Sequence, residues 1–422
     1  MLEISRIKEQ KNEIIELLKV RNFDGSALIN DVLELDKKWR EAKGELDTVA
    51  SESNKIAKEI GMLFGQGKIE EANAAKTKTA DLKEKSKQLS EKVNDFANQI
   101  TKKLYEIPNV PNKIVPTGKS DADNEVIFED APEVKLQKND LPHWELAKKH
   151  DLIDWELGVK VTGAGFPFYT GKGARLQRSI INFFLDQARD AGYKEIIPPF
   201  VVNEASGIGT GQLPDKEGQM YHCGVDDLYL IPTAEVPLTN MFRDVIVKTE
   251  DFPIQVTGYT PCFRREAGSY GKDVRGLNRL HQFDKVEIVR IEHPDNSYKA
   301  LDEMVNYVES LLKKLELPYR KLKLCGGDLG FTSALTFDLE VYSAAQKMWL
   351  EVSSISNFET FQANRLKLRF KNENKKSQLV HTLNGSALAL PRILAAILEN
   401  NQTEDGIKIP KVLVPYTGFD KI

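Results

Sequence analysis

Two stretches near the start of the chain have apolar residues at strictly alternating spacings of three and four, and this feature constrains the fold most. The first covers residues 32–63, where only Ser53 interrupts the apolar stripe, and the second covers residues 72–100. A period of 3.5 residues keeps one stripe of a helix facing a partner helix. The sequence therefore predicts two long helices of a coiled coil.

The two predicted helices should fold back on each other as a hairpin. Gly65 and Gly67 break the pattern between them, and Pro108 prevents further helix after the second. Two runs of matched length joined by a short turn form an antiparallel αα-hairpin. At ~1.5 Å per residue, about 32 residues reach on the order of 48 Å. Because two helices bury little surface, we expect a projecting arm.

Charged side chains cover the outer faces of this arm, and two interpretations stay open. Interleaved Lys and Glu are typical of a solvated coiled-coil surface. In the alternative, some lysines bind nucleic-acid phosphates; the candidates are Lys76, Lys78, Lys83, Lys85 and Lys87. The formal net charge of −4 excludes a generally basic protein. It does not exclude an RNA partner, since a bound phosphate responds to the local potential.

The rest of the chain has the mixed pattern of an α+β domain. Residues 108–140 are rich in Pro, Asn and Asp, which predicts an extended linker. Beyond them, helix-like and strand-like runs alternate, and prolines lie at strand edges, which favours a mainly antiparallel sheet. The expected helices cover residues 173–190, 301–315 and 388–399, and the expected strands cover residues 195–202, 244–247, 285–290 and 321–324.

Common cofactor and metal motifs are missing from the sequence. No phosphate-binding GxxxxGK[ST] loop occurs, and the glycines of residues 207–212 lack dinucleotide spacing, so we expect a mobile loop there. Cys223, Cys262 and Cys325 show neither zinc-ligand spacing nor a disulfide framework. No zinc is expected, and three scattered cysteines fit a reducing compartment. The sequence also has no apolar leader and no run of 18 apolar residues, so no membrane span is expected.

Residues 262–289 carry the most informative chemistry. Their pattern predicts two antiparallel strands joined by a long polar loop. Arg264 and Glu266 are two residues apart, which places them on one strand face. An arginine and a carboxylate on one face can bind a phosphate and a purine amino group. An ordinary ion pair across the strands is the alternative.

Two later stretches add candidate ligands for phosphates and a cation. Glu351 and Ser354 offer oxygens suited to a hard cation, or simply line a strand surface. An Asn-Gly-Ser loop at residues 384–386 leads into an apolar helix with Arg392 in its first turn. A buried arginine is costly unless paired, so Arg392 favours an anion, or else a helix-terminal salt bridge.

These stretches together resemble the class II aminoacyl-tRNA synthetases. Residues 263–287 resemble motif 2, residues 384–399 resemble motif 3, and residues 192–200, with Pro199, resemble motif 1. The sequences at 231–238 and 351–365, like the predicted arm, resemble the seryl members in particular. The resemblance implies a helical tRNA-binding arm domain at residues 1–107 with its coiled coil at about 32–100, a linker at 108–140 and a class II catalytic domain at 141–422.

The resemblance also implies roles for individual residues. Arg264, Glu351 and Arg392 would be catalytic, and Glu351 with Ser354 would hold Mg²⁺. Arg264 would bind the α-phosphate and the serine carboxylate, Glu266 the adenine amino group, and Arg392 the γ-phosphate. The implied ATP-binding set is Arg264, Glu266, Phe283, Glu351, Val352, Ser353, Ser354 and Arg392. The implied serine-binding set is Thr233, Ala234, Glu235, Arg264, Glu287, Asn384 and Ser386.

The implied function is a cytoplasmic, homodimeric serine–tRNA ligase that uses ATP and Mg²⁺. Its partners would be L-serine and tRNA(Ser), with tRNA(Sec) left open. One alternative is a catalytically inactive synthetase-like tRNA-binding or interaction protein, which should lack Arg264, Glu351 or Arg392. Another is a ligase that loads carrier proteins, which should lack the arm. A zinc-dependent archaeal type is disfavoured by the missing Cys/His spacing.

Overall fold

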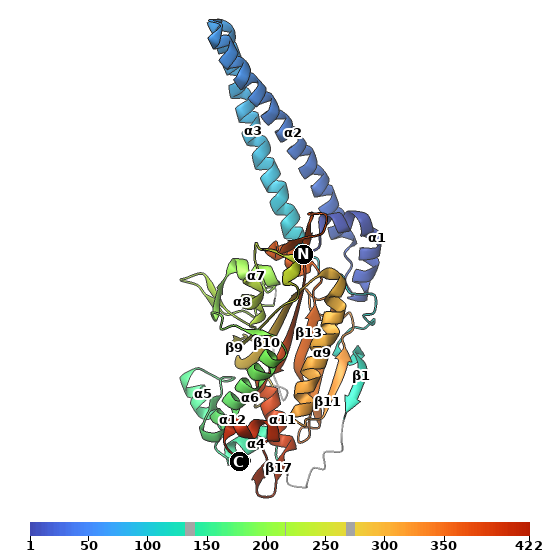
Figure 1. Cartoon of the computed structure of the whole chain (residues 1–422), viewed down its shortest axis with the longest axis vertical. Coiled ribbons are helices and arrows are strands. Elements are labelled where there is room, and N and C mark those ends of the chain that lie inside the picture. Colours follow the sequence, from blue (N-terminus) through green and yellow to red (C-terminus); the bar gives the residue numbers. More distant parts are fainter. Residues whose placement is uncertain (131–139, 216, 267–274) are drawn as a thin grey trace. The chain divides into compact units, whose positions relative to one another are not determined.

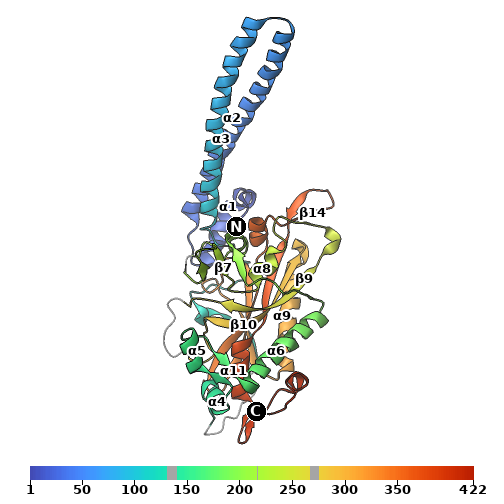
Figure 2. The same cartoon turned by 90° about the vertical axis from the view of Figure 1, so that its left-hand side faces the viewer.

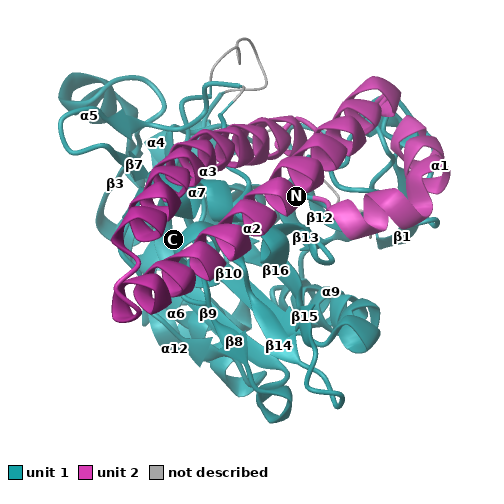
Figure 3. Ribbon diagram, turned by 90° about the horizontal axis from the view of Figure 1, so that it is seen from above, with its two compact units in different colours: residues 1, 20–22, 109–422 teal, residues 2–19, 23–108 magenta. Residues whose placement is uncertain are grey.

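The computed structural model describes residues 1–130, 140–215, 217–266 and 275–422. Contacts divide the chain into two compact units (Figure 3). One contains Leu2–Lys19 and Phe23–Pro108, and the other contains Met1, Val20–Asn22 and Asn109–Ile422. None of the helices among the described residues has the length and apolar character needed to cross a membrane.

The first unit is built around two long helices, as the heptads predict. Helix α1 spans Ile4–Val20, α2 spans Ser26–Gly65 and α3 spans Ile69–Leu104. Helices α2 and α3 run side by side along their length (Figures 1 and 2). The buried side chains between them include Val49 and Ile56 of α2 and Ala72 and Leu89 of α3. Residues 66–68 form the turn, where Gly67 has a positive φ of 73°.

Ion pairs between α2 and α3 support this hairpin. Lys103 lies 2.6 Å from Asp31, and Lys78 lies 3.3 Å from Glu52. The four side chains are between 32% and 62% exposed. Each pair therefore contributes on the order of 0–1 kcal/mol to the free energy of unfolding. The apolar stripe, more than these pairs, therefore holds the two helices together.

An eight-stranded sheet forms the centre of the second unit, in the order β1-β11-β12-β13-β16-β10-β9-β4. Every neighbouring pair is antiparallel except β4 with β9. The prediction of an α+β fold with a mainly antiparallel sheet is confirmed. The strands are β1 Glu125–Asp130, β4 Lys194–Glu195, β9 Ile254–Phe263, β10 Gln282–Glu292, β11 Tyr319–Lys323, β12 Leu335–Ser343, β13 Met348–Asn357 and β16 His381–Ala389.

Helices pack against this sheet and complete its core. The helices of this unit are α4 His143–Lys149, α5 Trp155–Val161, α6 Gly171–Asp190, α7 Glu204–Thr210, α8 Glu235–Asn240, α9 Ser297–Lys314, α10 Phe361–Leu366, α11 Leu390–Asn400 and α12 Val414–Thr417. Phe184 of α6, Val308 of α9 and Leu394 of α11 share one apolar cluster with Val286 and Leu339 of the sheet. Burying each such side chain contributes roughly 1.5–3 kcal/mol, so the strands that carry the site lie on a rigid support.

Short strands form four small additional sheets within the described part of the chain. Strands β5 Val201–Asn203, β6 His222–Cys223 and β7 Leu228–Leu230 form one, and β8 Ile246–Val247, β14 Arg369–Lys371 and β15 Ser377–Leu379 form another. The remaining two pair β2 Ile153–Asp154 with β3 Phe168–Tyr169, and β17 Gln402–Thr403 with β18 Gly406–Ile407.

The segment at residues 108–140 is more ordered than its composition indicates. Residues 125–130 form β1, which pairs with β11 at the edge of the main sheet. Asn109 is 1% exposed, and its amide donates to the carbonyl oxygens of Thr332 and Phe358. A Pro- and Asn-rich segment can therefore be fixed by main-chain pairing that composition does not reveal. Residues 131–139 lie outside the described residues.

Three further expectations were wrong in detail. Residues 195–202 form the two strands β4 and β5 of different sheets, since Pro198 and Pro199 cannot donate to a ladder. Residues 384–386 lie inside β16 and are not a loop. Residues 207–210 lie in α7 and are not a mobile loop. Their glycines are needed for packing, because a Cβ at Gly207 would lie 2.7 Å from Leu213 and one at Gly209 2.6 Å from Leu366.

Candidate active site

The candidate site begins in the motif 2 region, where β9 ends and β10 starts. The two strands pair antiparallel as predicted, with Gln282 opposite Phe263. Arg264 and Glu266, however, lie beyond the end of β9, and Glu266 has a positive φ of 48°. The expectation that they share a strand face was therefore wrong, because the ladder stops before them. Residues 267–274 of this motif lie outside the described residues.

Arg264 lies over an aromatic ring at the start of β10. Its guanidinium carbon is 5.2 Å from the centroid of Phe283, and its Nε donates to the carbonyl oxygen of Pro232 at 3.4 Å. The backbone of Arg264 is fixed separately, since its N–H donates to the carbonyl oxygen of His281 at 2.9 Å. A flat ring beside a cation offers a stacking surface and a phosphate ligand within one small area.

Glu266 pairs with Arg279 on the returning side of the same motif, at 2.8 Å between Nη1 and Oε2. The Glu266 carboxylate is 16% exposed and Arg279 is 46% exposed. This ion pair joins two residues outside the strands, so it differs from the cross-strand pair considered from the sequence. Because one partner is well solvated, the pair contributes little to stability, and Glu266 keeps accepting capacity for another donor.

A fully buried carboxylate, Glu287, organises the second half of the site. It accepts from Lys285 at 2.7 Å, from Thr233 at 3.3 Å and from Asn384 at 3.0 Å. Lys285 and Glu287 share a face of β10 because they are two residues apart. Across the ladder, Glu287 faces Ser386 of β16. These side chains form a compact, buried cluster of hydrogen-bond donors and acceptors.

A second buried carboxylate, Glu235 at the start of α8, lies beside this cluster. Gln362 of α10 donates to it at 2.6 Å. Burial, with a further contribution from the charge of Glu287, raises the pKa of Glu235 to about 7. Burial also raises the pKa of Glu287, against the opposing effect of Lys285. Adjacent Ala234 is completely buried and packs in an apolar cluster.

Arg392 lies in the first turn of α11, as predicted, and is held from two sides. Its Nη1 donates to the carbonyl oxygen of Glu351 at 2.6 Å and lies 3.7 Å from the Glu351 carboxylate. Its Nε donates to the carbonyl oxygen of Asn278 at 3.2 Å. The guanidinium is 27% exposed, so it is fixed in direction but still reachable by an anion.

A bulge in β13 brings Glu351 and Ser354 to the same face of the sheet. In a regular strand, residues three apart point to opposite faces. Here the register shifts, so that Glu351 pairs with Glu340 and Ser354 with Asp338, and the extra residue restores a common face. The buried side chain of Val352 packs in the core, and Ser353 donates to the carbonyl oxygen of Ser386 at 2.5 Å.

This face of β12 and β13 is strongly acidic. Burial first, and then the charge of Glu351, raises the pKa of Asp338 well above its usual value. Burial raises the pKa of Glu340 as well, although Arg320 opposes it. One oxygen of Asp338, Oδ1, is buried and has no hydrogen-bond partner among the described residues. A cation beside Glu351 and Ser354 would relieve this repulsion, so the donor set fits a hard divalent ion.

Four residues of the site were missed from the sequence: Lys285, Asp338, Glu340 and Gln362. Lys285 and Glu287 alternate with apolar Val286 and Ile288, and Asp338 and Glu340 alternate with Phe337 and Leu339. That period-two pattern would have placed each pair on one strand face. Gln362 has no such signal, since only tertiary packing brings α10 to Glu235.

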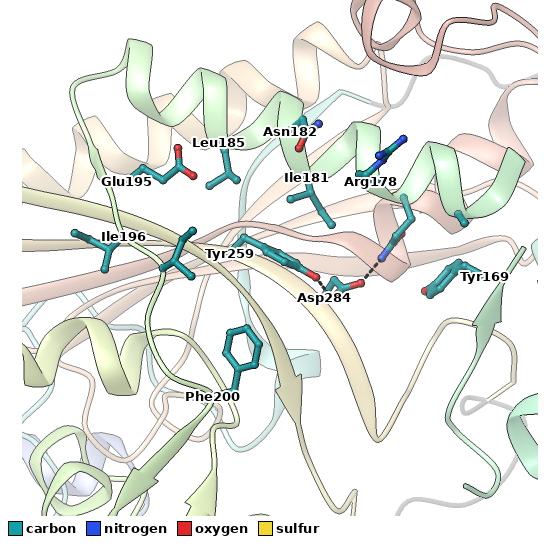
Figure 4. Close-up of a pocket in the computed structure, with 13 residues that line it drawn as sticks. Tyr169, Arg178, Ile181, Asn182, Leu185, Glu195, Ile196, Phe200, Tyr259 and Asp284 are labelled. Atoms are coloured by element: carbon teal, nitrogen blue, oxygen red, sulfur yellow. Dashed lines mark hydrogen bonds between the residues drawn. The ribbon is translucent and has the colours of Figure 1, made fainter. Parts of the chain in front are cut away.

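A separate cavity of about 610 Å³ lies between α6, the β4 region and β9 (Figure 4). Its walls are mostly apolar and include Ile181, Leu185, Ile196 and Phe200. At its polar end, Asp284 accepts from Tyr259 at 2.8 Å and from Gln177 at 3.0 Å. Nearby Ile197 is 84% exposed, so this face offers unpaired apolar surface.

Comparison with known proteins identifies relatives of this chain. Residues 221–401 match the model of the tRNA synthetase class II core domain (G, H, P, S and T), and residues 1–111 match the seryl-tRNA synthetase N-terminal domain. The serine–tRNA ligase of Salinibacter ruber is 51% identical over 100% of this chain and 99% of its own length. That of Akkermansia muciniphila is 44% identical, with the same coverage.

Solved structures show the same likeness in three dimensions. The seryl-tRNA synthetase of Pyrococcus horikoshii, crystallised with ATP, has a TM-score of 0.90 and 33% identity, covering 100% of this chain and 99% of that one. The cytoplasmic serine–tRNA ligase of Naegleria fowleri, in complex with AMP, has a TM-score of 0.86 and 28% identity, covering 100% and 98%. From its arm, its antiparallel sheet, its arginine and carboxylate clusters and these relatives, the chain belongs to the seryl-tRNA synthetase family of class II aminoacyl-tRNA synthetases.

Proposed function

We propose that the chain, as a serine–tRNA ligase, activates serine with ATP and then transfers it to tRNA. In the first step the serine carboxylate attacks the α-phosphorus in line, and pyrophosphate leaves. In the second step a ribose hydroxyl at the 3′ end of tRNA attacks the carbonyl of the adenylate, and AMP leaves. Neither step needs a protein nucleophile, so the residues act by position and charge.

The ATP half of the site would be bound by the residues around β9, β10 and α11. Arg264 is proposed to bind the α-phosphate and the serine carboxylate, and Phe283 to stack on adenine. Glu266 would accept from the adenine amino group, and Arg392 would bind the γ-phosphate. Negative charge develops on phosphate oxygens during the reaction, and two preorganised guanidinium groups stabilise it most where it develops.

The cluster around Glu287 is the observation that carries the serine assignment. The buried carboxylate of Glu287, with Thr233, Asn384 and Ser386 around it, is proposed to bind the ammonium and the small hydroxyl of serine. Glu235 supplies a second carboxylate beside it. Alanine or glycine offers no hydroxyl to the polar side chains of this cluster, which is the physical basis for rejecting them.

A magnesium ion is proposed at Glu351 and Ser354. Their oxygens share one face through the β13 bulge, next to the repelling carboxylates of Asp338 and Glu340. When bound, the ion would supply positive charge to the phosphates of ATP. Val352 and Ser353 support this segment from the buried side.

The three free cysteines fit a reducing compartment such as the cytoplasm.

The hairpin of α2 and α3 is proposed to bind the RNA, with tRNA(Ser) as substrate and tRNA(Sec) as a further candidate. The exposed lysines of α3, Lys76, Lys78, Lys83, Lys85 and Lys87, are the proposed phosphate ligands. RNA helices are bound mostly by shape and through phosphates and 2′-hydroxyls. Binding by many such contacts should weaken steeply as salt increases.

We also propose a homodimer through α6 and the β4 region. The cavity there is lined by apolar side chains, and Ile197 is largely exposed. A second copy would bury this apolar surface, which is the usual driving force for a symmetric dimer.

ATP–pyrophosphate exchange, measured in the presence of each standard amino acid in turn, tests the proposal. Serine should drive exchange far better than threonine, alanine or glycine. Equal exchange with alanine would refute the role of the Glu287 cluster. An absence of exchange with any amino acid, together with retained tRNA binding, would favour the inactive RNA-binding alternative instead.

A further inference from the structure

A buried polar network lies outside the residues assigned to ATP and serine. Its centre is the pair of His143, the first residue of α4, and Glu399 in the last turn of α11; both are 0% exposed. His143 Nδ1 lies 2.7 Å from Glu399 Oε1. Ser343 also donates to Glu399. Burial alone would raise the pKa of Glu399, but the hydrogen bonds from His143 and Ser343 together lower it.

The other nitrogen of His143 is an acceptor, and this fixes the tautomer. The backbone N–H of Leu277 donates to His143 Nε2 at 2.8 Å. A nitrogen that accepts carries no proton, so Nδ1 carries it and donates to Glu399. Gly276 allows this contact, because a Cβ there would lie 2.2 Å from Nε2. His143 thus holds the main chain at Leu277, which is itself buried.

A second branch of the network reaches the next residue of the same stretch. Gln346, in the turn between β12 and β13, donates to Glu399 at 3.1 Å. Its Oε1 accepts from Asn278 at 2.7 Å, and the carbonyl oxygen of Asn278 accepts from Arg392 Nε. Two branches from one carboxylate therefore hold Leu277 and Asn278.

The stretch held in this way supports three of the residues proposed for ATP. Asn278 contacts Arg392, Arg279 pairs with Glu266, and His281 bonds the backbone of Arg264; these contacts are 3.2, 2.8 and 2.9 Å long. Arg392 and Glu399 are seven residues apart on α11, which is two turns and the same helix face. Glu399 and Arg392 therefore lie on the same face of α11. Arg392 contacts residues 277–278 directly, and Glu399 is linked to them through His143 and Gln346.

We propose that His143, Glu399 and Gln346 are positioning residues for ATP, which hold residues 277–278 so that Arg392 is aimed at the bound nucleotide. The proposal rests on the proposed function and adds to it the residues that determine the geometry of the phosphate clamp. Of the residues proposed for serine, only Arg264 contacts this stretch, through the carbonyl oxygen of His281. The buried cluster on β10 and β16 shares none of these contacts. Loss of the network should therefore change the kinetics of ATP and leave those of serine.

Two substitutions at His143 separate its two hydrogen bonds. An asparagine reaches the position of Nδ1 and keeps a donor to Glu399, but leaves the Leu277 N–H without an acceptor. A glutamine reaches the position of Nε2 and can accept from Leu277. In pyrophosphate exchange, His143→Asn should lower kcat/KM for ATP by about tenfold, the order expected for one unpaired buried donor. His143→Gln should recover most of that loss, and KM for serine should stay within about twofold in both.

Gln346→Met provides an independent variant that leaves the His143–Glu399 pair in place and should also lower kcat/KM for ATP. The matched control is Asn400→Ala, on the same helix. Asn400 bonds the backbone of Tyr342 and Ala344 at 2.8 and 3.1 Å and contacts neither Leu277 nor Asn278. It should lower the melting temperature without a selective change for ATP.

A double-variant cycle tests whether the effect passes through Arg392. Added to Arg392→Ala, His143→Asn should cost less than about twofold more. A further full tenfold loss would overturn the proposal, as would equal changes for ATP and serine in folded His143→Asn and Gln346→Met. If the unaltered protein shows serine-dependent exchange and these variants match it, the network has no positioning role, and the proposed function stands. If the unaltered protein shows no exchange, the proposed function itself fails.

Discussion

The carboxyl group of Glu235 changes its protonation near neutral pH, and serine binding should follow it. Its pKa in the folded protein is about 7, against an ordinary value of 4.5. Below pH 7 the group is mostly neutral and cannot pair with an ammonium, so serine must first displace its proton. We expect KM for serine in pyrophosphate exchange to rise by up to about tenfold per pH unit below 7 and to level off above it.

Substitution of Glu235 by glutamine provides the check. The variant should bind serine weakly at all pH values and lose the slope below pH 7; a slope that persists unchanged would assign the titration to another group.

The same pKa shift of Glu235 has a consequence for the stability of the fold. Because the carboxyl pKa is raised in the folded protein, this group contributes most to the free energy of unfolding below pH 4.5. That contribution is lost as pH rises through 7.

Arg264 and Arg392 should each be worth several kcal/mol in the activation step. Removing a preorganised donor aimed at developing charge costs about 3–4 kcal/mol, or roughly a hundred- to thousandfold in rate. Single-turnover formation of seryl-adenylate by Arg264→Ala and Arg392→Ala should show this loss, with unchanged circular dichroism. Arg189→Ala, on a residue that is 62% exposed, is the control. Activation within a few-fold of normal would remove the role from that arginine.

The α6 face should control the oligomeric state. Ile197 is 84% exposed beside the apolar cavity, and a charge there would have to be buried in a dimer interface. Ile197→Glu should therefore shift the protein from dimer to monomer in analytical ultracentrifugation at micromolar concentration. Val225→Glu, at a residue that is 98% exposed in the turn between β6 and β7, should leave the dimer intact. A wild-type protein that sediments as an active monomer would contradict the proposal.

The elements that the sequence predicts well are those whose signal is local. The heptads place the ends of α2 and α3 within six residues of their observed positions, because each stripe depends only on its own helix and one partner. Helix α7 was missed. Its glycines leave room for the side chains of Leu213 and Leu366, and no local sequence pattern shows this packing. The bulge that unites Glu351 and Ser354 depends on pairing with β12. Family resemblance named these two residues, but the backbone geometry that joins them is not readable from spacing.

Across the whole chain, adenylate formation and tRNA charging should be separable. No residue proposed for ATP or serine lies in α2 or α3, so deleting about residues 32–100 and closing the gap with a short turn should spare serine-dependent exchange. Transfer of serine to tRNA should fall by orders of magnitude, because holding a long RNA needs many weak backbone contacts. Exchange and charging are measured on the same preparation. A truncated protein that charges tRNA at near full efficiency would refute the arm's role, and a folded one that loses exchange would refute the separation.

The hairpin of α2 and α3 also restricts how such an arm can change length in evolution. One inserted residue in α2 rotates everything beyond it by about 100° and turns the apolar stripe away from α3. Only an insertion of about seven residues, matched by another in α3, restores the contact, so the arm lengthens in paired increments of ~10.5 Å. The length of the hairpin can therefore change only in steps of one heptad in each helix. A single unmatched insertion must be absorbed by a local stutter or by the turn at residues 66–68.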